Sequence, residues 1–270
     1  MNDQDSTKIE IRQIFYDDES LMKIQSPFMP LDNRYGDKSW FEFFPILNFL
    51  RNTELEDNVF YGFLSPKFSL KTGLSPVDAI AMVRKKIDKD VVLFSYAWDQ
   101  LCYFLNPWEQ GEIVHPGIMA ETQKFLHSVG VDLKLSELIT SRKNSVFSNF
   151  IVAKKEYWNS WKILAEIFLH YCDNGENGLS HRTVEYRRRQ RPMKVFIQER
   201  LPALILRDRK LSTAAVDVNS GFTAPYFVNS RENVEKLLAC DTIKNKIIEN
   251  GINQKLIVEL INARKCVLFK

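Results

Sequence analysis

The segment VVLFSY, residues 91–96, constrains the fold most, because its side chains form a continuous apolar run. A strand of this kind must be covered by protein on both faces, as in the centre of a sheet. The segment VFYGFL, residues 59–64, also predicts a buried strand. Between them, Ser75 followed by Pro76 is expected to cap a helix that continues to about Lys86. This alternation of strands and helices predicts an α/β protein with a layered sheet.

Further strands and helices follow the same pattern. Alternating side chains predict a first strand over residues 8–17, and residues 148–155 are expected to form another. Apolar side chains three and four residues apart predict a long amphipathic helix after residue 155, and a second helix over residues 193–206. The final fifty residues are expected to form two more helices. They are predicted near residues 231–250 and 254–263.

The predicted strands lie in residues 1–218, which we expect to form one α/β domain. Residues 219–270 are then expected to form a helical C-terminal extension packed on that domain. Within the domain, Ser39 is expected to cap a helix with Glu42 as its capping-box partner. Residues 71–73, Lys-Thr-Gly, are expected to form a surface turn.

The composition excludes several classes of protein. The 270 residues are 45% hydrophobic, which suits a large core, and no apolar run reaches the roughly 18 residues of a membrane span. The N-terminal residues MNDQDS are too polar for a secretory signal. The four cysteines never form a CxxC pair, which argues for reduced thiols and against a zinc site. We therefore expect a cytoplasmic protein, with peripheral contact at the cytoplasmic membrane face as a further option.

Residues 182–194 form a basic segment in an otherwise balanced chain. Six basic residues and one acid give this segment a charge of +5, so the rest of the chain carries −2 of the total of +3. The arginines could clamp a diphosphate, contact anionic lipid headgroups or lie in solvent. Without a recognisable nucleic-acid module, we expect no nucleic-acid partner. The candidate ligand-binding arginines are Arg187, Arg188, Arg189 and Arg191.

Several familiar catalytic motifs are absent from the sequence, including GxxxxGK[ST], GxGxxG, GxSxG and HExxH. One D-x-D pair, Asp88 and Asp90, could in principle hold a divalent cation against a diphosphate. It precedes the strand at residues 91–96, whereas ligands in open α/β sheets bind beyond the carboxyl ends of strands. We therefore interpret this pair as a solvated turn.

Acids and aromatic side chains follow the strand at residues 91–96, on its carboxyl side. Aromatic rings can stack on a sugar, and carboxylates can accept hydrogen bonds from its hydroxyl groups. The same segment could also be a loop folded over the core, and the sequence leaves both possibilities open. The residues concerned are Trp98, Asp99, Trp108, Glu109, Glu112 and His115. Of these, Trp98, Trp108, Glu112 and His115 are the candidate acceptor-binding residues.

Glu199 lies in the predicted helix over residues 193–206, which is apolar on nearly every side. A carboxylate in that position must be paired, or burial raises its pKa. A glutamate of raised pKa beside a ligand is a good general base. The alternative is a structural ion pair with Arg187, Arg191 or Arg200.

Five segments, taken in order, resemble bacterial glycosyltransferase-like proteins from surface-polysaccharide clusters and, more distantly, capsular glycosyltransferases of the GT-A type. They are NVFYGFLSPKF, DVVLFSYAWDQ, HPGIMAETQKFL, SNFIVAKKEYWNSWKILAEIF and RPMKVFIQERLPALIL. The resemblance covers about residues 9–206 and rests on the pattern and order of these segments. It implies a GT-A-like, Rossmann-like mixed sheet flanked by helices.

The resemblance also implies roles for individual residues. Tyr61, Ser65 and Lys67 would line the donor pocket, Asn149 would lie near the acceptor, and Glu199 would be the base. Because the D-x-D pair is missing from the expected strand exit, dependence on Mn²⁺ or Mg²⁺ is uncertain. The resemblance leaves two alternatives: Asp99, which is also the second candidate base, holds such a metal alone, or Lys67 and the arginines replace the cation.

The resemblance implies an enzyme that transfers a sugar from a nucleotide-diphosphate donor to a glycan or lipid-linked acceptor in surface-polysaccharide synthesis. The alternative is a non-catalytic protein that grips an anionic partner through residues 182–194. A phosphoryl-processing enzyme would need clustered acids around a metal, which only residues 99–115 could supply.

Overall fold

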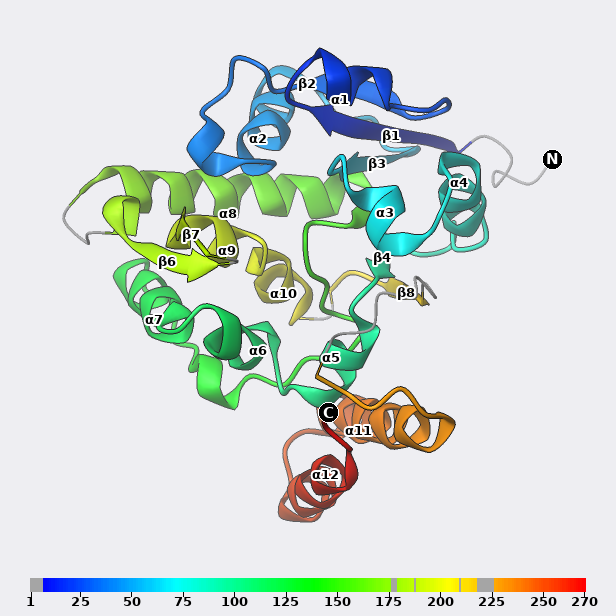
Figure 1. The fold of residues 1–270 in the computed structure, drawn as a ribbon, viewed down its shortest axis with the longest axis vertical. Helices are drawn as coiled ribbons and strands as arrows, with labels where there is room; N and C mark the ends of the chain where they lie inside the picture. Colours follow the sequence, from blue (N-terminus) through cyan, green and yellow to red (C-terminus); the bar gives the residue numbers. More distant parts are fainter. Residues whose placement is uncertain (1–6, 176–178, 187, 209, 218–225) are drawn as a thin grey trace.

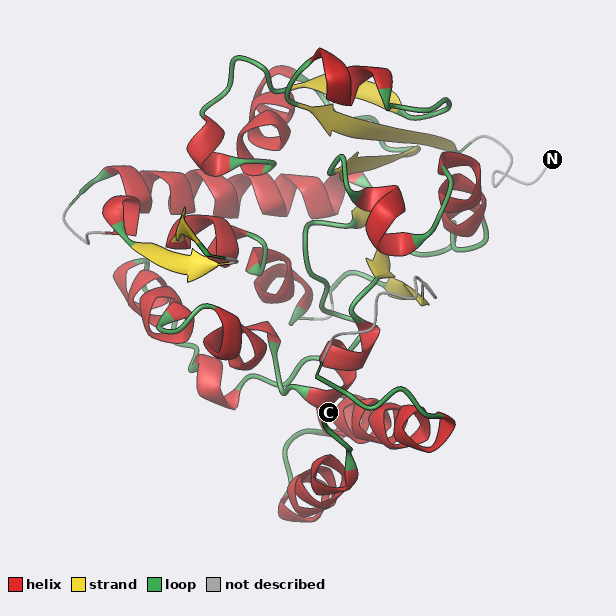
Figure 2. Ribbon diagram, in the orientation of Figure 1, coloured by secondary structure: helices red, strands yellow, loops and turns green. Residues whose placement is uncertain are grey.

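The computed structural model describes residues 7–175, 179–186, 188–208, 210–217 and 226–270. In these ranges the chain forms an α/β structure, with helices on both sides of a mixed sheet (Figures 1 and 2). The predicted α/β class is therefore confirmed, and the sheet is compatible with a Rossmann-like fold. The boundary expected at residue 218 lies outside the described residues.

Six strands of the described chain form the main sheet, in the order β2-β1-β3-β5-β4-β8. Strand β5 runs antiparallel to its neighbours β3 and β4, whereas the other neighbouring strands pair in parallel. The carboxyl ends of the parallel strands therefore lie at one edge, where β5 begins. The strands are β1 (Lys8–Phe15), β2 (Met29–Asp32), β3 (Val59–Leu64), β4 (Val91–Ser95), β5 (Ile151–Ala153) and β8 (Thr213–Asp217).

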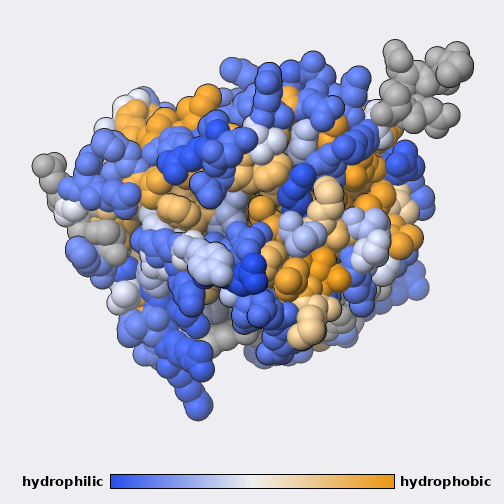
Figure 3. Space-filling view, turned by 90° about the horizontal axis from the view of Figure 1, so that it is seen from above, coloured by the Kyte–Doolittle hydropathy of each residue, from blue (hydrophilic) through white to orange (hydrophobic). Residues whose placement is uncertain are grey.

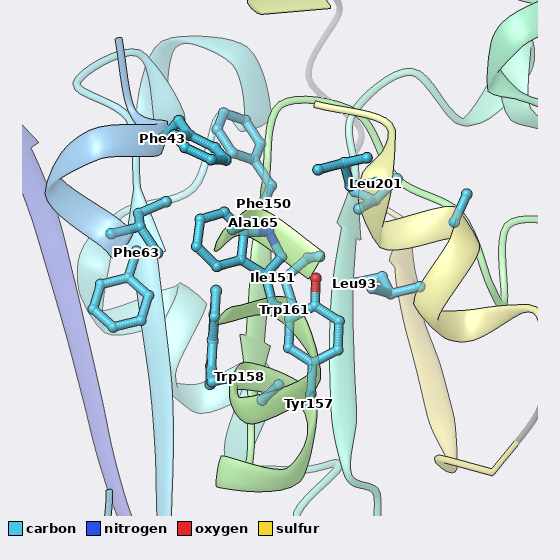
Figure 4. Packing of buried hydrophobic residues seen from close by; sticks show 14 of the residues in the cluster. Phe43, Phe63, Leu93, Phe150, Ile151, Tyr157, Trp158, Trp161, Ala165 and Leu201 are labelled. Atoms are coloured by element: carbon cyan, nitrogen blue, oxygen red, sulfur yellow. The ribbon is translucent and has the colours of Figure 1, made fainter. Parts of the chain in front are cut away.

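Every residue of β3, β4 and β5 is buried, which confirms that the apolar runs are central strands. The long helix α8 (Lys155–Asp173) covers one face, as Figure 4 shows for its aromatic side chains. Phe63 of β3 meets Trp158 edge to face, with ring centroids 4.7 Å apart. The Trp158 Nε1 group also donates a 2.9 Å hydrogen bond to the Tyr61 carbonyl oxygen. Packing and hydrogen bonding thus fix α8 on the sheet.

The remaining elements surround this core. Figure 3 shows the molecule from above, with hydrophobic residues gathered in patches between hydrophilic ones. No helix in the described ranges is long and apolar enough to cross a membrane. The helices and the small hairpin are α1 (Asp18–Met22), η2 (Lys38–Trp40), α2 (Phe43–Asn52), α3 (Phe68–Thr72), α4 (Pro76–Arg84), α5 (Trp98–Tyr103), α6 (Pro107–Val114), α7 (Ile118–Ser128), η3 (Leu135–Glu137), η4 (Leu179–His181), β6 (Thr183–Tyr186), β7 (Arg189–Pro192), α9 (Met193–Gln198), α10 (Leu201–Leu206), α11 (Arg231–Asn250) and α12 (Gln254–Cys266).

The helix predicted over residues 193–206 is wrong as a single element. It is broken into α9 and α10, and Glu199 and Arg200 lie at the break. Pro202 explains the break, because it has no N–H for the carbonyl of Gln198 and its ring crowds that carbonyl. The segment after Tyr96, for which an irregular loop was one of two possibilities, forms helices α5 and α6.

The capping box expected at Ser39 is not formed. Asp37 caps the short helix η2 instead, by accepting a 2.8 Å hydrogen bond from the Ser39 backbone N–H. Helix α2 begins later, at Phe43, with Pro45 in its first turn, where proline is tolerated. Glu42 precedes that helix without capping it, so its carboxyl group is available for other contacts.

Helices α11 and α12 form a second apolar cluster against α5, which includes Cys102, Leu237 and Leu260 (Figure 1). Lys244 of α11 is fully buried in this contact. Its ammonium group donates hydrogen bonds of 2.5 and 2.6 Å to the carbonyl oxygens of Leu101 and Phe104 at the end of α5. A buried cation at a helix carboxyl end is favoured by the helix dipole. Lys244 therefore ties the C-terminal helices to the domain.

We expect Lys244→Met to lower the free energy of unfolding by about 2–4 kcal/mol, because two buried carbonyl groups lose their donor. Urea unfolding followed by tryptophan fluorescence measures this change. Lys246→Met, at an exposed position of the same helix, is the control and should change stability by less than about 0.5 kcal/mol. Equal effects of the two replacements would contradict the role of Lys244.

Candidate functional site at the carboxyl edge of the sheet

Polar residues gather where the parallel strands end and β5 begins. Ligands of open α/β sheets bind at this edge, because backbone and side chains there are not covered by strand pairing. Three segments bring charged groups to it, namely the loop before α2, helix α3 with the residue that precedes it, and the break between α9 and α10. The turn before β5 adds uncharged polar side chains. The residues are Tyr16, Asn33, Glu42, Lys67, Lys71, Tyr96, Ser148, Asn149, Gln198, Glu199 and Arg200.

Glu42 follows Phe41, which adopts a left-handed backbone conformation with a φ of 48°. Its carboxyl group faces the Tyr16 hydroxyl, which is buried and makes no hydrogen bond of good geometry within the described chain. Burial raises the pKa of Glu42, and the positive charges of Lys71 and Lys67 offset only part of this effect. Glu42 therefore holds a proton more readily than a surface glutamate.

Glu199 lies at the break between α9 and α10. Burial raises the pKa of Glu199 from 4.5 to about 7, and the negative charge of Glu42 acts in the same direction. Lys71 and Arg200 lower this pKa but do not outweigh burial. The residue nevertheless keeps part of its surface accessible to solvent, so a ligand can approach it. Near neutral pH Glu199 is present in both protonation states.

Lys71 is partly buried in α3, so the expected surface turn at residues 71–73 is wrong. Its Nζ atom lies 2.9 Å from the Ser148 Oγ and 3.4 Å from the Tyr96 hydroxyl. Burial alone would lower the pKa of Lys71, but Tyr96, Glu199 and Glu42 together raise it. Lys71 is therefore a cation at neutral pH, held beside two carboxyl groups.

Arg200 is buried and does not neutralise Glu199 through an ion pair. It donates hydrogen bonds of 2.8, 2.7 and 2.8 Å to the Pro107 carbonyl, the Phe196 carbonyl and the Gln110 side chain. Burial lowers the pKa of Arg200 to about 10, so the group stays charged at neutral pH. Arg200 thus joins the break between α9 and α10 to α6.

Glu199 makes no ion pair within 4.0 Å among the described residues, so the structural pair that the sequence allowed is not formed with Arg191 or Arg200. Arg187, the third partner considered, lies outside those residues. The site therefore holds a carboxyl group that can take up and return a proton near pH 7, beside a fixed cation. This combination is suited to general acid–base chemistry on a hydroxyl group.

The residues expected to bind a donor are only partly brought together. Ser65 lies at the carboxyl edge, where its Oγ accepts a 3.2 Å hydrogen bond from the Lys67 backbone N–H. Lys67 is exposed, and its charge reaches Glu42. The Tyr61 hydroxyl instead accepts a 3.1 Å hydrogen bond from the backbone N–H of Glu56, in the loop before β3. Tyr61 therefore points away from the other two.

Of the candidate arginines, Arg188, Arg189 and Arg191 belong to the hairpin of β6 and β7. Arg187 lies outside the described residues. Arg188 and Arg189 are exposed, and Arg188 has a left-handed φ of 61°. The Arg191 guanidinium carbon lies 5.5 Å from the centre of the Phe41 ring, in the residue that precedes Glu42. Among the described candidate arginines, Arg191 is therefore connected to the site through its contact with Phe41.

The aromatic and acidic residues after β4 are occupied in the protein interior. Trp108 is fully buried and donates a 3.0 Å hydrogen bond to Thr122, so its prediction as a sugar-stacking ring is wrong. Trp98 packs against the cluster formed with α11 and α12. Glu109 accepts hydrogen bonds from the Leu105 backbone N–H and from Arg264, which holds α6 against the C-terminal helices.

Glu112 and His115 also have structural contacts. The Glu112 carboxylate accepts hydrogen bonds of 2.9 and 2.6 Å from the backbone N–H groups of Gly117 and Met119, at the start of α7. His115 is buried and stacks on Phe196, with ring centroids 3.5 Å apart. Burial, with the charge of Arg200, lowers the pKa of His115 to about 3, so the ring is neutral at pH 7. The expectation that both bind an acceptor is corrected, because capping engages Glu112 and stacking buries His115.

Asp99 is buried in α5 and accepts a 2.8 Å hydrogen bond from the backbone N–H of Gln100. It is not among the residues that gather around Glu199. Within the described ranges, no three acids, histidines or cysteines come together as metal ligands. Beside Glu42 and Glu199 the third charged group is Lys71, which repels a cation. The donor set therefore does not fit Mn²⁺ or Mg²⁺.

The D-x-D pair lies at the opposite edge, as expected. Asp90 accepts hydrogen bonds from Ser212 and from Lys154, which fastens the start of β4 to β8 and β5. A cavity of about 270 Å³ also lies near this edge, lined by residues of the loop at 141–144, β8 and α11. Its lining includes none of the residues around Glu199. The candidate site lies at the carboxyl edge, because Glu42, Lys71 and Glu199, whose pKa values are shifted, come together there.

Sequence reasoning missed Glu42, Lys71, Tyr96 and Ser148 as members of the site. Lys71 was assigned to a surface turn, whereas it belongs to the short helix α3. Glu42 was expected to be part of a helix cap. Because α2 begins only at Phe43, the Glu42 side chain makes no capping hydrogen bond and is available for the site. Tyr96 and Ser148 are far apart in sequence, and the antiparallel strand β5 brings them to 3.2 Å.

Searches with the sequence and with the fold found no match among protein-family models, curated proteins or solved structures. The function is therefore argued from the geometry and charge of the site.

We expect the raised pKa of Glu199 to make the protein less stable as the pH rises from about 4.5 to about 7. In that interval Glu199 holds its proton in the folded protein but not in the unfolded chain, so its contribution to stability is lost as the pH rises. His115, whose pKa is lowered, contributes in the opposite direction, so the effect of Glu199 is isolated by comparison with a variant of Glu199 itself. Glu199→Gln stays neutral and should therefore exceed the natural protein in stability by roughly 2 kcal/mol at pH 8 but not at pH 5. Urea unfolding at both pH values measures this difference. A difference that is equal at pH 5 and pH 8 would show that Glu199 has an ordinary pKa.

Proposed function

We propose that this protein is a glycosyltransferase that moves a sugar from a nucleotide-diphosphate donor to a glycan or lipid-linked acceptor in surface-polysaccharide synthesis. The observation that carries the proposal is Glu199, a carboxyl group of raised pKa at the carboxyl edge of a mixed sheet, beside a fixed lysine. The ordered sequence resemblance supports the same class. The GT-A type of fold belongs to the proposal, since the mixed α/β sheet is compatible with it.

In the proposed reaction the acceptor hydroxyl oxygen bonds to the anomeric carbon of the donor sugar. The bond from that carbon to the phosphate oxygen breaks, and the electron pair leaves with the nucleoside diphosphate. Glu199 takes the hydroxyl proton, which its pKa near 7 allows in neutral solution. Glu199 acts because it is partly accessible, whereas Asp99 is buried elsewhere in α5.

The leaving diphosphate carries negative charge that cations must stabilise. Lys67 is exposed at the carboxyl edge and is free to extend toward a ligand. Arg191, beside Phe41, offers a planar guanidinium group from the hairpin. Since the acids present do not fit a divalent cation, the proposal assigns this task to these side chains. Lys71 is held by Ser148 and keeps a positive charge beside Glu199.

A second candidate function is the non-catalytic binding of an anionic partner. It is favoured by Arg188 and Arg189, which are exposed and make no ion pair within the described residues. Such binding would weaken strongly with salt, because the arginines would displace counterions. The two functions differ in whether the protein turns over a nucleotide sugar.

We expect Glu199→Gln to lower sugar transfer by about 10²–10⁴-fold, because the acceptor hydroxyl loses its base. Release of nucleoside diphosphate with a mixture of nucleotide sugars and acceptor glycans measures this rate. Binding of the donor, measured by thermal shift, should persist, since Glu199 is not assigned to the diphosphate. Glu156→Gln, at an exposed position of α8, is the control.

The two outcomes that would contradict the proposal are distinct. Undiminished transfer by Glu199→Gln would remove the base assignment and leave the transferase activity standing. If the natural protein neither bound nor hydrolysed any nucleotide sugar, with or without Mn²⁺, the transferase function itself would be wrong.

Reversing the charges of Arg188 and Arg189 to glutamate tests the second candidate. If the protein is a transferase, we expect the KM for the donor to rise several-fold while kcat is largely retained. Comparing the KM for the donor at about 50 and about 200 mM salt shows how much of donor binding is electrostatic. The pair Arg231→Glu and Lys246→Glu makes the same charge change at exposed positions of α11 and is the control. Salt-sensitive association with anionic vesicles that is lost on reversal, without turnover, would favour the binding function instead.

A further inference from the structure

The turn at Ser148 and Asn149, immediately before β5, contacts both sides of the charged site. We infer that this turn fixes the position of Glu199 relative to Lys71, so that Ser148, Asn149 and Gln198 are positioning residues. The inference rests on the proposed function for its importance and deepens it. It concerns the geometry of the site, however, and can be tested without substrate.

The backbone of the turn is held in an uncommon conformation. Ser148 and Asn149 have φ angles of 62° and 51°, and two successive left-handed residues that are not glycine are rare. Such conformations persist where surrounding contacts determine them, and they cluster at functional sites. The Ile151 backbone N–H closes the turn with a 2.8 Å hydrogen bond to the Asn149 carbonyl oxygen.

The first residue of the turn holds the cation. The Ser148 Oγ lies 2.9 Å from the Lys71 Nζ and 3.2 Å from the Tyr96 hydroxyl. Since Tyr96 follows β4 and Lys71 belongs to α3, Ser148 joins two elements that approach from different strands. The position of the ammonium group therefore depends on the turn.

The second residue holds the carboxylate segment. The Asn149 Nδ2 group donates a 3.1 Å hydrogen bond to the Gln198 Oε1, and both residues are buried. Gln198 ends α9 and directly precedes Glu199. At the break the Glu199 backbone N–H still donates a 3.4 Å hydrogen bond to the Val195 carbonyl, and the Arg200 N–H donates a 2.9 Å bond to the Ile197 carbonyl. These bonds hold Glu199 to α9 alone, whereas the amide pair connects the end of α9 to the turn before β5.

The need to satisfy buried hydrogen-bonding groups does not explain why two amides lie here. The Asn149 Oδ1 and the Gln198 Nε2 are buried without a partner in the described chain. Exchanging the oxygen and nitrogen of both amides preserves one bond and still leaves one donor and one acceptor unpaired. Apolar side chains would avoid both unpaired groups. A positional role accounts for amides at these two places.

The test measures the coupling between Lys71 and Glu199. The groups whose charges act on Glu199 are Lys71, Arg200 and Glu42, so removing Lys71 changes one known contribution. Lys71→Met should raise the pKa of Glu199 by about 1 in the natural background. In Asn149→Gly, which accepts the left-handed backbone but lacks the amide, the same replacement should raise it by less than half as much. Carboxyl-carbon NMR titration of labelled glutamates, with Glu199 assigned through Glu199→Gln, gives these pKa values.

Asn174→Gly removes an exposed amide whose hydrogen bond within the described residues is to His170 of its own helix, and it should leave the coupling unchanged. Gln198→Leu removes the other amide of the pair and should reduce the coupling as Asn149→Gly does. It also serves if the glycine variant fails to fold. An increment in the pKa of Glu199 that is the same in all backgrounds would overturn the positioning role. Because no substrate is used, that result would leave the transferase proposal intact, whereas lack of turnover would leave the coupling result intact.

Discussion

Burial of the central strands on both faces decides where polar chemistry can occur in this protein. Strands β3, β4 and β5 have no accessible residue, so charged groups near the middle of the molecule can lie only at the ends of the strands. At the amino edge of β4 they are paired, as Asp90 is with Ser212 and Lys154. At the carboxyl edge Glu199 makes no ion pair with the described residues, and Glu42 faces the neutral Tyr16 hydroxyl. The same burial that stabilises the sheet thus concentrates perturbed charges at one edge.

The antiparallel direction of β5 is the second constraint. A parallel strand in its place would bring its carboxyl end, at Ala153, to the functional edge. Because β5 runs the other way, its preceding turn reaches that edge and presents Ser148 and Asn149 to Lys71 and Gln198. One reversed strand therefore joins the cation, the carboxylate and the sheet in a single arrangement.

The sequence was sufficient for the elements that depend on local pattern. Strand β3 has the predicted bounds, and the cap at Ser75 forms, with its side chain accepting a hydrogen bond from the Asp78 backbone N–H. The prediction that burial would raise the pKa of Glu199 agrees with the structure, although the helix around it is broken at Pro202. Contacts between residues that are far apart in the sequence could not be predicted. For example, the sequence suggests that Glu112 binds a ligand, but in the fold its carboxylate accepts hydrogen bonds from backbone N–H groups at the start of α7.

The contacts among Ser148, Lys71 and Tyr96 could also be interpreted as a serine nucleophile with a lysine base. The charges decide against that interpretation. A lysine base must be neutral at working pH, which burial without nearby anions would promote. Here Tyr96, Glu199 and Glu42 outweigh burial and raise the pKa of Lys71, so its ammonium group can only donate to the Ser148 oxygen. The group able to take a proton near neutral pH is Glu199 itself, and Lys71 keeps that pKa from rising further. The cluster is therefore organised around a carboxylate base, and the serine serves to hold the cation beside it.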